Sequence, residues 1–319
     1  MSARGSRRLV DPQLIPFLDL LPPLELCAET LAAARASSMR LPVDQAFVEL
    51  VEMTAHHVPG PPEAPDVKVL VYRPKAAKGD LPCIFHTHGG GYIGGAAADL
   101  EGLHRPMAAE LGCCIVATDY RLAPETRHPG PVEDAYAALR WLHENAAAMG
   151  IRSDRIGIMG ESAGGGLAAA VALMARDQGT CPLAFQHLIY PMLDDRTCVV
   201  AEPHPYAGEF LWTAHNNAFA WGALLGVEPG SKDVSPYAAP ARAETLAGLP
   251  ATYVATGALD LFLEEDIEYA RRLMRDGVPV ELHVYPGAFH AFDIAPGAAV
   301  AAQARRDSLA ALARALFPR

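Results

Sequence analysis

The pattern G-x-S-x-G at residues 160–164 constrains this chain more than any other feature. A strand-like run at 156–159 comes directly before it, and an alanine-rich stretch at 167–175, which predicts a helix, follows it. A serine in such a strand-to-helix turn has strained backbone angles, and the residues two positions away must lack a Cβ. The turn places the hydroxyl above the carboxyl edge of a sheet and at a helix N-terminus, where developing negative charge is favoured. The pattern therefore predicts that Ser162 is a nucleophile.

A glycine-rich turn before a helix is also typical of phosphate-binding loops. The stretch from Gly160 to Gly166 lacks the Gly-Lys-Ser/Thr ending of a P-loop. The dinucleotide fingerprint occurs only in a degenerate form, at Gly164, Gly166 and Ala169. Because a serine already occupies the turn, the nucleophile is the better interpretation.

Short apolar runs alternate with amphipathic helical patterns along most of the chain. The strand-like runs lie at residues 67–72, 83–87, 114–118, 156–159, 188–190, 252–255 and 281–285. The helical patterns lie at residues 102–111, 132–145, 264–276 and 298–316. This alternation predicts an α/β protein with a mostly parallel central sheet, flanked by helices on both faces.

Two stretches do not follow this alternation. Residues 1–45 have helical patterns and precede the first strand-like run, and residues 196–230 form a long stretch without strands. The second stretch carries three large aromatic residues on a helical spacing, Trp212, Phe219 and Trp221. We expect residues 46–195 and 231–319 to form the catalytic domain, with 1–45 and 196–230 as a helical cap over the site. The alternative is that both stretches are ordinary peripheral helices.

The sequence His-Gly-Gly-Gly at residues 88–91 follows the second strand-like run. Successive glycines let backbone N–H groups turn toward a ligand, as the oxyanion hole of an acyl-transfer enzyme requires. Gly90 contributes in every arrangement, and the choice of a second donor between Gly89 and Gly91 stays open. A further donor is expected to be the N–H of Ala163, the residue after the nucleophile.

His88 is expected to hold this glycine loop by a hydrogen bond rather than to take part in the chemistry. His86 and His88 form an H-x-H pair, which is found in some metal sites. No third histidine, cysteine or carboxylate follows at ligand spacing, so we expect no metal site.

The general base should follow Ser162 in the chain, because hydrolases with this turn have the order nucleophile, acid, histidine. Five histidines follow the serine: His187, His204, His215, His283 and His290. The first and fourth belong to strand patterns, and the second and third lie in the expected cap. His290 is on a loop that leaves the carboxyl edge of the sheet, where it can reach Ser162. We therefore predict that His290 is the general base.

The acid should lie on the loop after the preceding strand. Asp260 occupies that loop, just after the run at 252–255, and would orient the imidazole and stabilise its protonated form. Glu264, Glu265 and Asp266 are typical of first-turn acids of the next helix. Asp260 is the preferred acid, and Glu264 is the fallback.

The composition narrows the class of ligand and the compartment. The 319 residues carry a formal charge of −11, which opposes nucleic-acid binding, and no stretch is long and apolar enough to predict a membrane span. We expect no signal peptide, because acidic residues and a proline interrupt the region after the basic N-terminus. The six cysteines form no CxxC pair, so we expect small buried thiols in a reducing cytoplasm.

Taken together, these residues resemble the hormone-sensitive-lipase family (family IV) of carboxylesterases in the α/β-hydrolase superfamily. The marks of that family are HGGG at 88–91, DYRLAPE at 119–125 and GESAGG at 160–165. The similarity continues through YPMLDD at 190–195, SPY at 235–237 and YPGAFH at 285–290, so it covers most of the chain from about residue 65. The resemblance implies the α/β-hydrolase fold with a helical cap, a Ser–His–Asp site at Ser162, His290 and Asp260, and makes a homodimer plausible.

Two positions depart from the family pattern. Glu161 stands where aspartate is commoner, which affects hydrogen bonding around the turn. The acid segment reads DLFLEE at 260–265 rather than the commoner D-P-L-x-D-E, so the assignment of Asp260 rests on a match with changed neighbours.

These features predict a serine carboxylesterase that hydrolyses short- to medium-chain acyl esters through an acyl-serine intermediate, with no cofactor. Amide hydrolysis or deacetylation on the same residues is an alternative that the sequence does not separate. A non-catalytic receptor for a small ligand is a further alternative from a different class, since fold alone does not imply function. Retention of Ser162, Asp260 and His290 argues against it.

Overall fold

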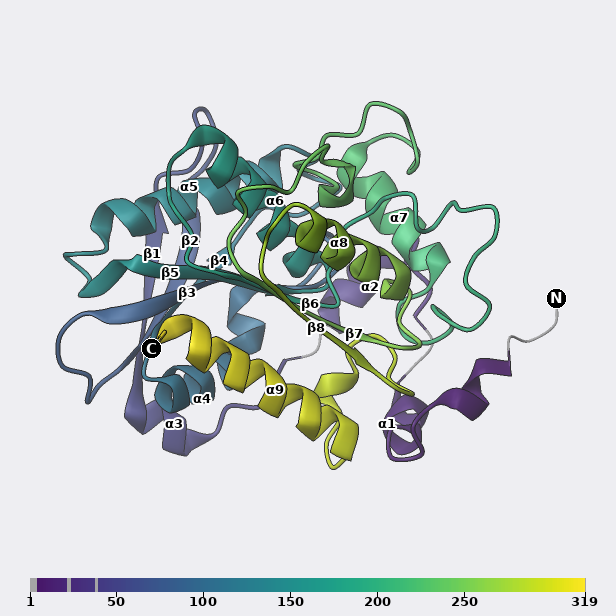
Figure 1. Cartoon of the computed structure of the whole chain (residues 1–319), viewed down its shortest axis with the longest axis horizontal. Coiled ribbons are helices and arrows are strands. Elements are labelled where there is room, and N and C mark those ends of the chain that lie inside the picture. The colour runs from purple at the N-terminus through teal and green to yellow at the C-terminus, as the bar shows by residue number, and fades with distance from the viewer. Residues whose placement is uncertain (1–4, 22–23, 38–39, 319) are drawn as a thin grey trace.

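The computed structural model describes residues 5–21, 24–37 and 40–318, which form one eight-stranded sheet covered by helices (Figure 1). The strands are β1 Val51–Val58, β2 Val67–Pro74, β3 Leu81–Thr87, β4 Cys114–Asp119, β5 Ile151–Glu161, β6 Gln186–Ile189, β7 Thr252–Gly257 and β8 Val280–Tyr285. Their order across the sheet is β1-β2-β4-β3-β5-β6-β7-β8. The pairs β1–β2 and β2–β4 are antiparallel, and all other pairs are parallel.

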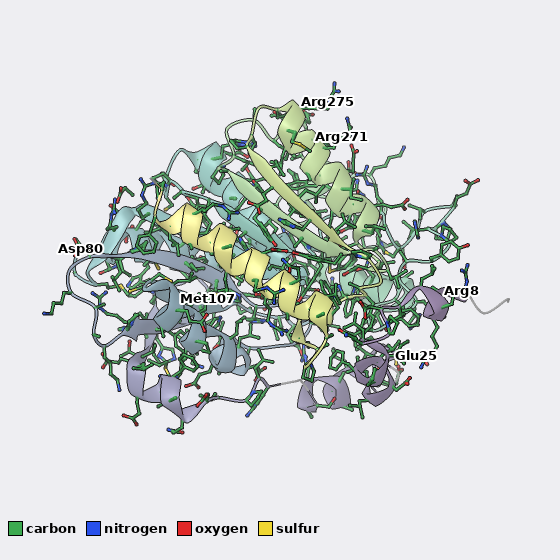
Figure 2. All side chains as sticks on the ribbon, turned by 60° about the horizontal axis from the view of Figure 1, so that its bottom comes forward. Arg8, Glu25, Asp80, Met107, Arg271 and Arg275 are labelled. Atoms are coloured by element: carbon green, nitrogen blue, oxygen red, sulfur yellow. The ribbon has the colours of Figure 1, made fainter. Side chains whose placement is uncertain are left out.

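Helices cover both faces of this sheet. The helices α4 Glu101–Leu111 and α9 Ala299–Leu316 pack on one face, and Figure 2 shows α9 lying across it. The helices α5 Gly130–Asn145, α6 Ala163–Gln178 and α8 Leu263–Arg275 pack on the other face. Residues that alternate along a strand enter different cores: Cys83 and Phe85 pack with α5 and α6, whereas Ile84 packs with α4 and α9. The mostly parallel sheet between two layers of helices, as predicted, is confirmed.

The first strand, β1, was not among the strands predicted from the sequence. Only Val51 and Val58, at the two ends of β1, are buried, so the strand has no apolar alternation that would reveal it. It lies at the edge of the sheet and pairs only with β2. The strand β5 also begins earlier than predicted. Its residues 152–154 are polar and exposed, so they give no apolar signal for a strand.

The segments outside this alternation are largely helical or irregular. The N-terminal segment holds the 3₁₀ helix η1 Gly5–Leu9 and the helices α1 Ile15–Leu20 and α2 Leu31–Ala36, and α3 Gln45–Leu50 leads into β1. The later segment contains α7 Ala214–Leu225, and short 3₁₀ helices occur at Ala97–Leu100, Pro240–Arg242 and Phe292–Ile294. Trp212 precedes α7, so the helical spacing predicted for the three aromatic residues holds only for Phe219 and Trp221.

Hydrogen bonds join the N-terminal segment to α7. The buried Asn216 accepts from the backbone N–H of Leu26 at 2.9 Å and donates to the carbonyl of Leu24 at 2.9 Å. Figure 2 marks the N-terminal segment by Arg8 and Glu25, which lie at one end of the molecule. The two segments that the sequence set apart therefore contact each other. No helix in the described part of the chain is both long and apolar enough to cross a membrane.

Candidate active site

The serine of the G-x-S-x-G pattern lies in a strained turn between β5 and α6. Ser162 has φ +56° and ψ −125°, a backbone conformation that residues other than glycine rarely adopt. A Cβ on Gly164 would lie 2.1 Å from the carbonyl oxygen of Thr87, so only glycine fits beside the end of β3. Ala163 begins α6, and its N–H is one of those that have no partner within the helix. The turn thus presents the serine hydroxyl beside free helix N–H groups.

Ser162, His290 and Asp260 form a continuous chain of hydrogen bonds. The distance from His290 Nε2 to Ser162 Oγ is 2.9 Å, and that from His290 Nδ1 to Asp260 Oδ2 is 2.8 Å. All three side chains are buried: Asp260 is 0% exposed, His290 5% and Ser162 8%. Because Asp260 accepts at Nδ1, that nitrogen carries the proton and Nε2 is free to accept one from the serine. The geometry is that of a nucleophile, a base and an orienting acid.

Backbone pairing of two loops brings the acid and the histidine together. The N–H of Ala258 donates to the carbonyl of Tyr285 at 2.9 Å, and the N–H of Leu259 donates to that of Ala288 at 2.8 Å. The loop after β7 therefore runs beside the loop after β8. The fallback acid, Glu264, is exposed on α8, and the carboxylate bonded to His290 is that of Asp260.

In the glycine loop at 88–91, the carbonyl groups of Gly89 and Gly90 are occupied by hydrogen bonds within and just after the loop. The carbonyl of Gly89 accepts from His88 Nδ1 at 2.8 Å, and that of Gly90 accepts from the N–H groups of Ile93 and Gly94 at 3.1 and 3.0 Å. Since N–H and C=O point in opposite directions across a trans peptide, the N–H groups of Gly90 and Gly91 point the other way. Within residues 40–318, the three N–H groups of Gly89, Gly90 and Gly91 donate to no protein acceptor. They are the free donors that an oxyanion hole needs.

His88 and Tyr120 hold the base of this loop. Their rings stack with centroids 4.3 Å apart, and the Tyr120 hydroxyl donates to the carbonyl of His88 at 2.7 Å. Burial lowers the pKa of His88, so its ring is neutral at pH 7 and donates through Nδ1 to Gly89. The structure therefore places His88 under the loop and in no contact with the serine hydroxyl or its histidine.

Two carboxylates behind the serine have buried partners that sequence reasoning did not identify. Glu161 Oε1 lies 2.9 Å from Nε2 of the fully buried His86, which gives the first histidine of the H-x-H pair a carboxylate partner. Asp293 Oδ1 accepts from the Tyr190 hydroxyl at 2.8 Å, and burial raises the pKa of that carboxyl. No cluster of three or more His, Cys, Asp or Glu side chains suited to a metal ion occurs among the residues described.

Three aromatic rings surround His290. The centroids of Tyr190, Phe262 and Trp212 lie 4.8, 5.3 and 6.2 Å from that of the imidazole. The Trp212 indole also lies against the glycine loop, because a Cβ on Gly91 would come within 2.5 Å of it. Its Nε1–H donates to Asn217 on α7 at 3.1 Å, which fixes the plane of the ring. The sequence marked Trp212 only as part of a helix, since nothing in local spacing links residue 212 to residues 91 and 290.

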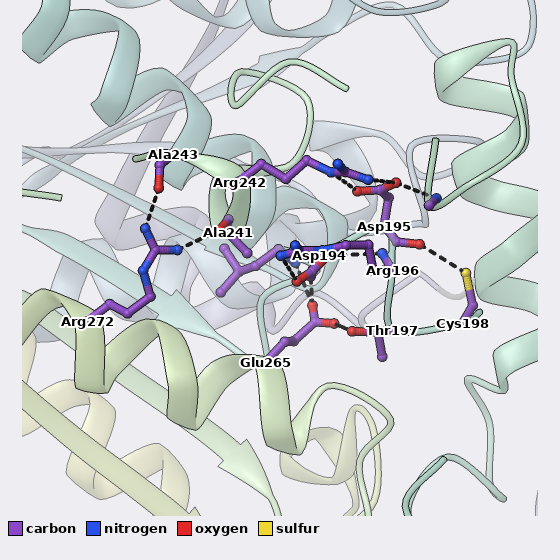
Figure 3. Close-up of polar contacts among 12 residues, drawn as sticks. Asp194, Asp195, Arg196, Thr197, Cys198, Ala241, Arg242, Ala243, Glu265 and Arg272 are labelled. Carbon is purple, nitrogen blue, oxygen red and sulfur yellow. Dashed lines mark hydrogen bonds and ion pairs between the residues drawn. The ribbon is translucent and has the colours of Figure 1, made fainter. Parts of the chain in front are cut away.

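Asp195 joins the two ends of the segment 196–230, which carries Trp212 (Figure 3). This fully buried carboxylate binds Arg242 through two contacts of 2.6 and 2.8 Å and accepts from the N–H of Gly230 at 2.7 Å. Glu265 on α8 accepts from the N–H groups of Leu193 and Asp194 at 2.6 and 3.2 Å. The start of the segment is thus fixed to α8 by Glu265, and its end at Gly230 is fixed to that start by Asp195.

Replacing Asp195 with alanine is expected to lower the free energy of unfolding by about 3–5 kcal/mol, because the largely buried Arg242 would lose its only buried counter-charge among the residues described. Urea denaturation measures this change. Asp194→Ala is the matched control: its ion pair is with the half-exposed Arg196, so a loss of about 1 kcal/mol or less is expected. Equal losses in the two variants would contradict this account of the segment's base.

Comparisons with known proteins show the family to which this chain belongs. The family model described as alpha/beta hydrolase fold matches residues 84–294. The carboxylesterase NlhH of Mycobacterium tuberculosis is 33% identical over 309 residues, which cover 96% of each chain. The esterase LipI of the same organism is 33% identical over 86% of this chain and 85% of its own.

A solved structure gives the same result in three dimensions. The bacterial heroin esterase superposes with a TM-score of 0.89 at 38% identity, covering 98% of this chain and 100% of its own. The fold and the site together define a serine hydrolase of the α/β-hydrolase fold. Within that class, the chain belongs to the hormone-sensitive-lipase (family IV) group of the α/β-hydrolase family, and it is a carboxylester hydrolase.

Proposed function

We propose that this chain hydrolyses short- to medium-chain acyl esters, with Ser162 as nucleophile, His290 as general base and Asp260 as the acid that orients it. The observation that carries the proposal is the 2.9 Å contact between Ser162 Oγ and His290 Nε2, at the end of the chain of hydrogen bonds from Asp260. No metal or organic cofactor takes part in this scheme.

The reaction has two halves. His290 takes the proton of Ser162 as the hydroxyl attacks the ester carbonyl, and the N–H groups of Ala163, Gly90 and either Gly89 or Gly91 stabilise the oxyanion. His290 then gives its proton to the leaving alcohol, which leaves an acyl-serine. In the second half, His290 activates a water molecule that hydrolyses the acyl-serine and restores the free enzyme.

The limited space around the serine supports small acyl groups. Ser162 is 8% exposed, and the rings of Trp212, Tyr190 and Phe262 crowd the adjacent His290. We propose that the N-terminal segment and residues 196–230, which contact each other through Asn216, form a cap over this site. The charge of −11 adds a preference for neutral substrates over anionic ones.

Hydrolysis of a p-nitrophenyl ester series, from acetate to palmitate, tests the proposal. We expect the highest kcat/KM between acetate and octanoate and a steep fall toward palmitate. The matching p-nitroanilides test the amidase alternative on the same residues, and we expect them to be hydrolysed far more slowly. A maximum at palmitate, or anilides that react as fast as esters, would refute this substrate class.

Trp212→Ala is expected to widen the substrate range. Removing the indole beside Gly91 and His290 opens space for longer chains, so the ratio of kcat/KM for decanoate to that for acetate should rise about tenfold or more. Trp141→Ala is the control, because Trp141 packs against His56, far from the serine in the sheet order. An unchanged ratio in the Trp212 variant would show that the indole does not limit the pocket.

Two further proposals concern the cell and the assembly. All six cysteines are free, and Cys83, Cys113, Cys114 and Cys181 are buried, which supports a reducing compartment, the cytoplasm. Fractionation of the producing cells tests it.

The family resemblance supports a homodimer, which sedimentation velocity tests: a single boundary at the mass of one chain, 34.0 kDa, would refute it.

A further inference from the structure

One arginine of the N-terminal segment reaches the turn that follows the glycine loop. Arg35, on α2, donates from Nε to the carbonyl of Ile93 at 2.6 Å and from Nη2 to the carbonyl of Ala123 at 2.8 Å. It also forms a two-pronged ion pair with Glu125, with both contacts at 2.7 Å. The Arg35 guanidinium holds the pKa of Glu125 down to about 2. A single side chain thus joins α2 to Ile93 and to residues 123–125, which are distant from it and from each other in sequence.

The carbonyl of Ile93 belongs to the turn that orients the oxyanion-hole peptides. The N–H groups of Ile93 and Gly94 both donate to the carbonyl of Gly90, which turns the N–H of Gly91 to the opposite side. The N–H of Ala123 donates to the carbonyl of Tyr92 at 2.9 Å. Arg35 therefore holds Ile93 directly and Tyr92 through Ala123, so it fixes two successive residues of this turn.

The two carbonyl contacts matter more than the ion pair. The side chain of Glu125 is 63% exposed, and such surface pairs contribute little to stability. A planar guanidinium can reach two carbonyl groups and a carboxylate at once, whereas a lysine ammonium cannot reproduce this fork. The two carbonyl contacts therefore require the shape of the guanidinium, and the positive charge alone would not provide them.

We propose that Arg35 is a positioning residue for the oxyanion hole, and that the N-terminal segment acts on catalysis through it. The inference rests on the proposed function, because it assigns Gly90 and a neighbouring glycine as oxyanion donors. Arg35 touches neither substrate nor Ser162. It determines how rigidly the free N–H groups face the developing charge, and displacements of about 1 Å at such donors can slow a reaction by about 100-fold.

The test uses full-length Arg35→Ala and Arg35→Lys with p-nitrophenyl butyrate. We expect kcat to fall about tenfold to 100-fold in Arg35→Ala while KM changes less than about twofold, since oxyanion donors act on the transition state. Arg35→Lys should recover part of the loss. An aryl trifluoromethyl ketone adds to the serine as a charged hemiketal, so its Ki should rise in parallel with the loss of kcat/KM. The Ki of butyramide, an uncharged ground-state analogue, should stay the same.

Two control variants separate positioning from stability. Glu125→Gln removes the ion pair but keeps both carbonyl contacts, and Arg7→Ala removes an exposed ion pair, with Asp19, from the same segment. Both should retain kcat and the Ki of the ketone within about twofold. All assays are run at least 15 °C below the melting temperature of each variant, and Arg35→Lys decides the outcome if Arg35→Ala does not fold.

The inference is overturned if the Arg35 variants keep kcat and ketone affinity, or if butyramide affinity falls as much as ketone affinity. Its failure is distinct from a failure of the proposed function. If only the role of Arg35 is wrong, Ser162→Ala is still inactive. If the proposed function is wrong, Ser162→Ala itself retains activity.

Discussion

Ser162→Ala is expected to lower kcat for p-nitrophenyl butyrate by about 10⁴-fold to 10⁶-fold, the range found when the nucleophile of a serine triad is removed. The reason lies in the geometry: Ser162 Oγ is the atom in contact with His290 Nε2 and stands at the N-terminus of α6. Without it no acyl-serine can form, and only the oxyanion donors and binding contribute. Steady-state assays at high enzyme concentration measure the residual rate.

Ser231→Ala is the matched control for this variant. Ser231 donates to the carbonyl of Glu228 in an exposed turn outside the site, so its loss should leave kcat within about twofold. Circular dichroism and thermal unfolding show whether Ser162→Ala keeps the fold. Residual activity above about 1% in a folded Ser162→Ala protein would contradict the assignment of the nucleophile.

Asp260→Asn is expected to lower kcat by about 10⁴-fold with little change in KM. The amide has nearly the shape of the carboxylate, so the contact to the N–H of Phe262 at 3.0 Å can be kept. It cannot stabilise a protonated His290, and its NH₂ group favours the tautomer in which Nε2 carries the proton and cannot act as a base. Asp260 is fully buried, so water does not compensate for the lost charge.

Glu264→Gln is the control, because Glu264 is the acid that the sequence left as a fallback. It is exposed on the first turn of α8, and we expect kcat to change less than about twofold. If Glu264→Gln were as damaging as Asp260→Asn, the assignment of the acid would have to be revised.

Local patterns were enough to predict the central part of the fold. The turn at Ser162 has a short-range signature, since the close approach of β3 to Gly164 admits no side chain there. The loop after each parallel strand emerges at the same edge of the sheet, so chain order together with position on such a loop led to Asp260 and His290. Most strands and helices were predicted to within a few residues, because buried parallel strands are nearly continuous apolar runs.

Features that depend on long-range packing could not be predicted. The strand β1 is exposed along its middle, so its sequence carries no apolar signal. Trp212 lies beside Gly91, and Arg35 binds Ile93, through contacts that join residues more than fifty positions apart. The partner of Glu161 is His86, on a neighbouring strand. Each of these pairings follows from the register of the sheet and the path of the two helical segments, which the sequence shows only in outline.

The central claim is that Ser162 carries the covalent intermediate, and labelling with diethyl p-nitrophenyl phosphate tests it most directly. This reagent phosphorylates an activated serine and releases p-nitrophenol, so the adduct can be counted and located by mass spectrometry. We expect one diethylphosphoryl group per chain, on the peptide containing Ser162, with esterase activity lost in proportion and no label in Ser162→Ala. A protein that stays active when fully labelled, or that is labelled at another residue, would contradict the account and favour a ligand-binding role for the site.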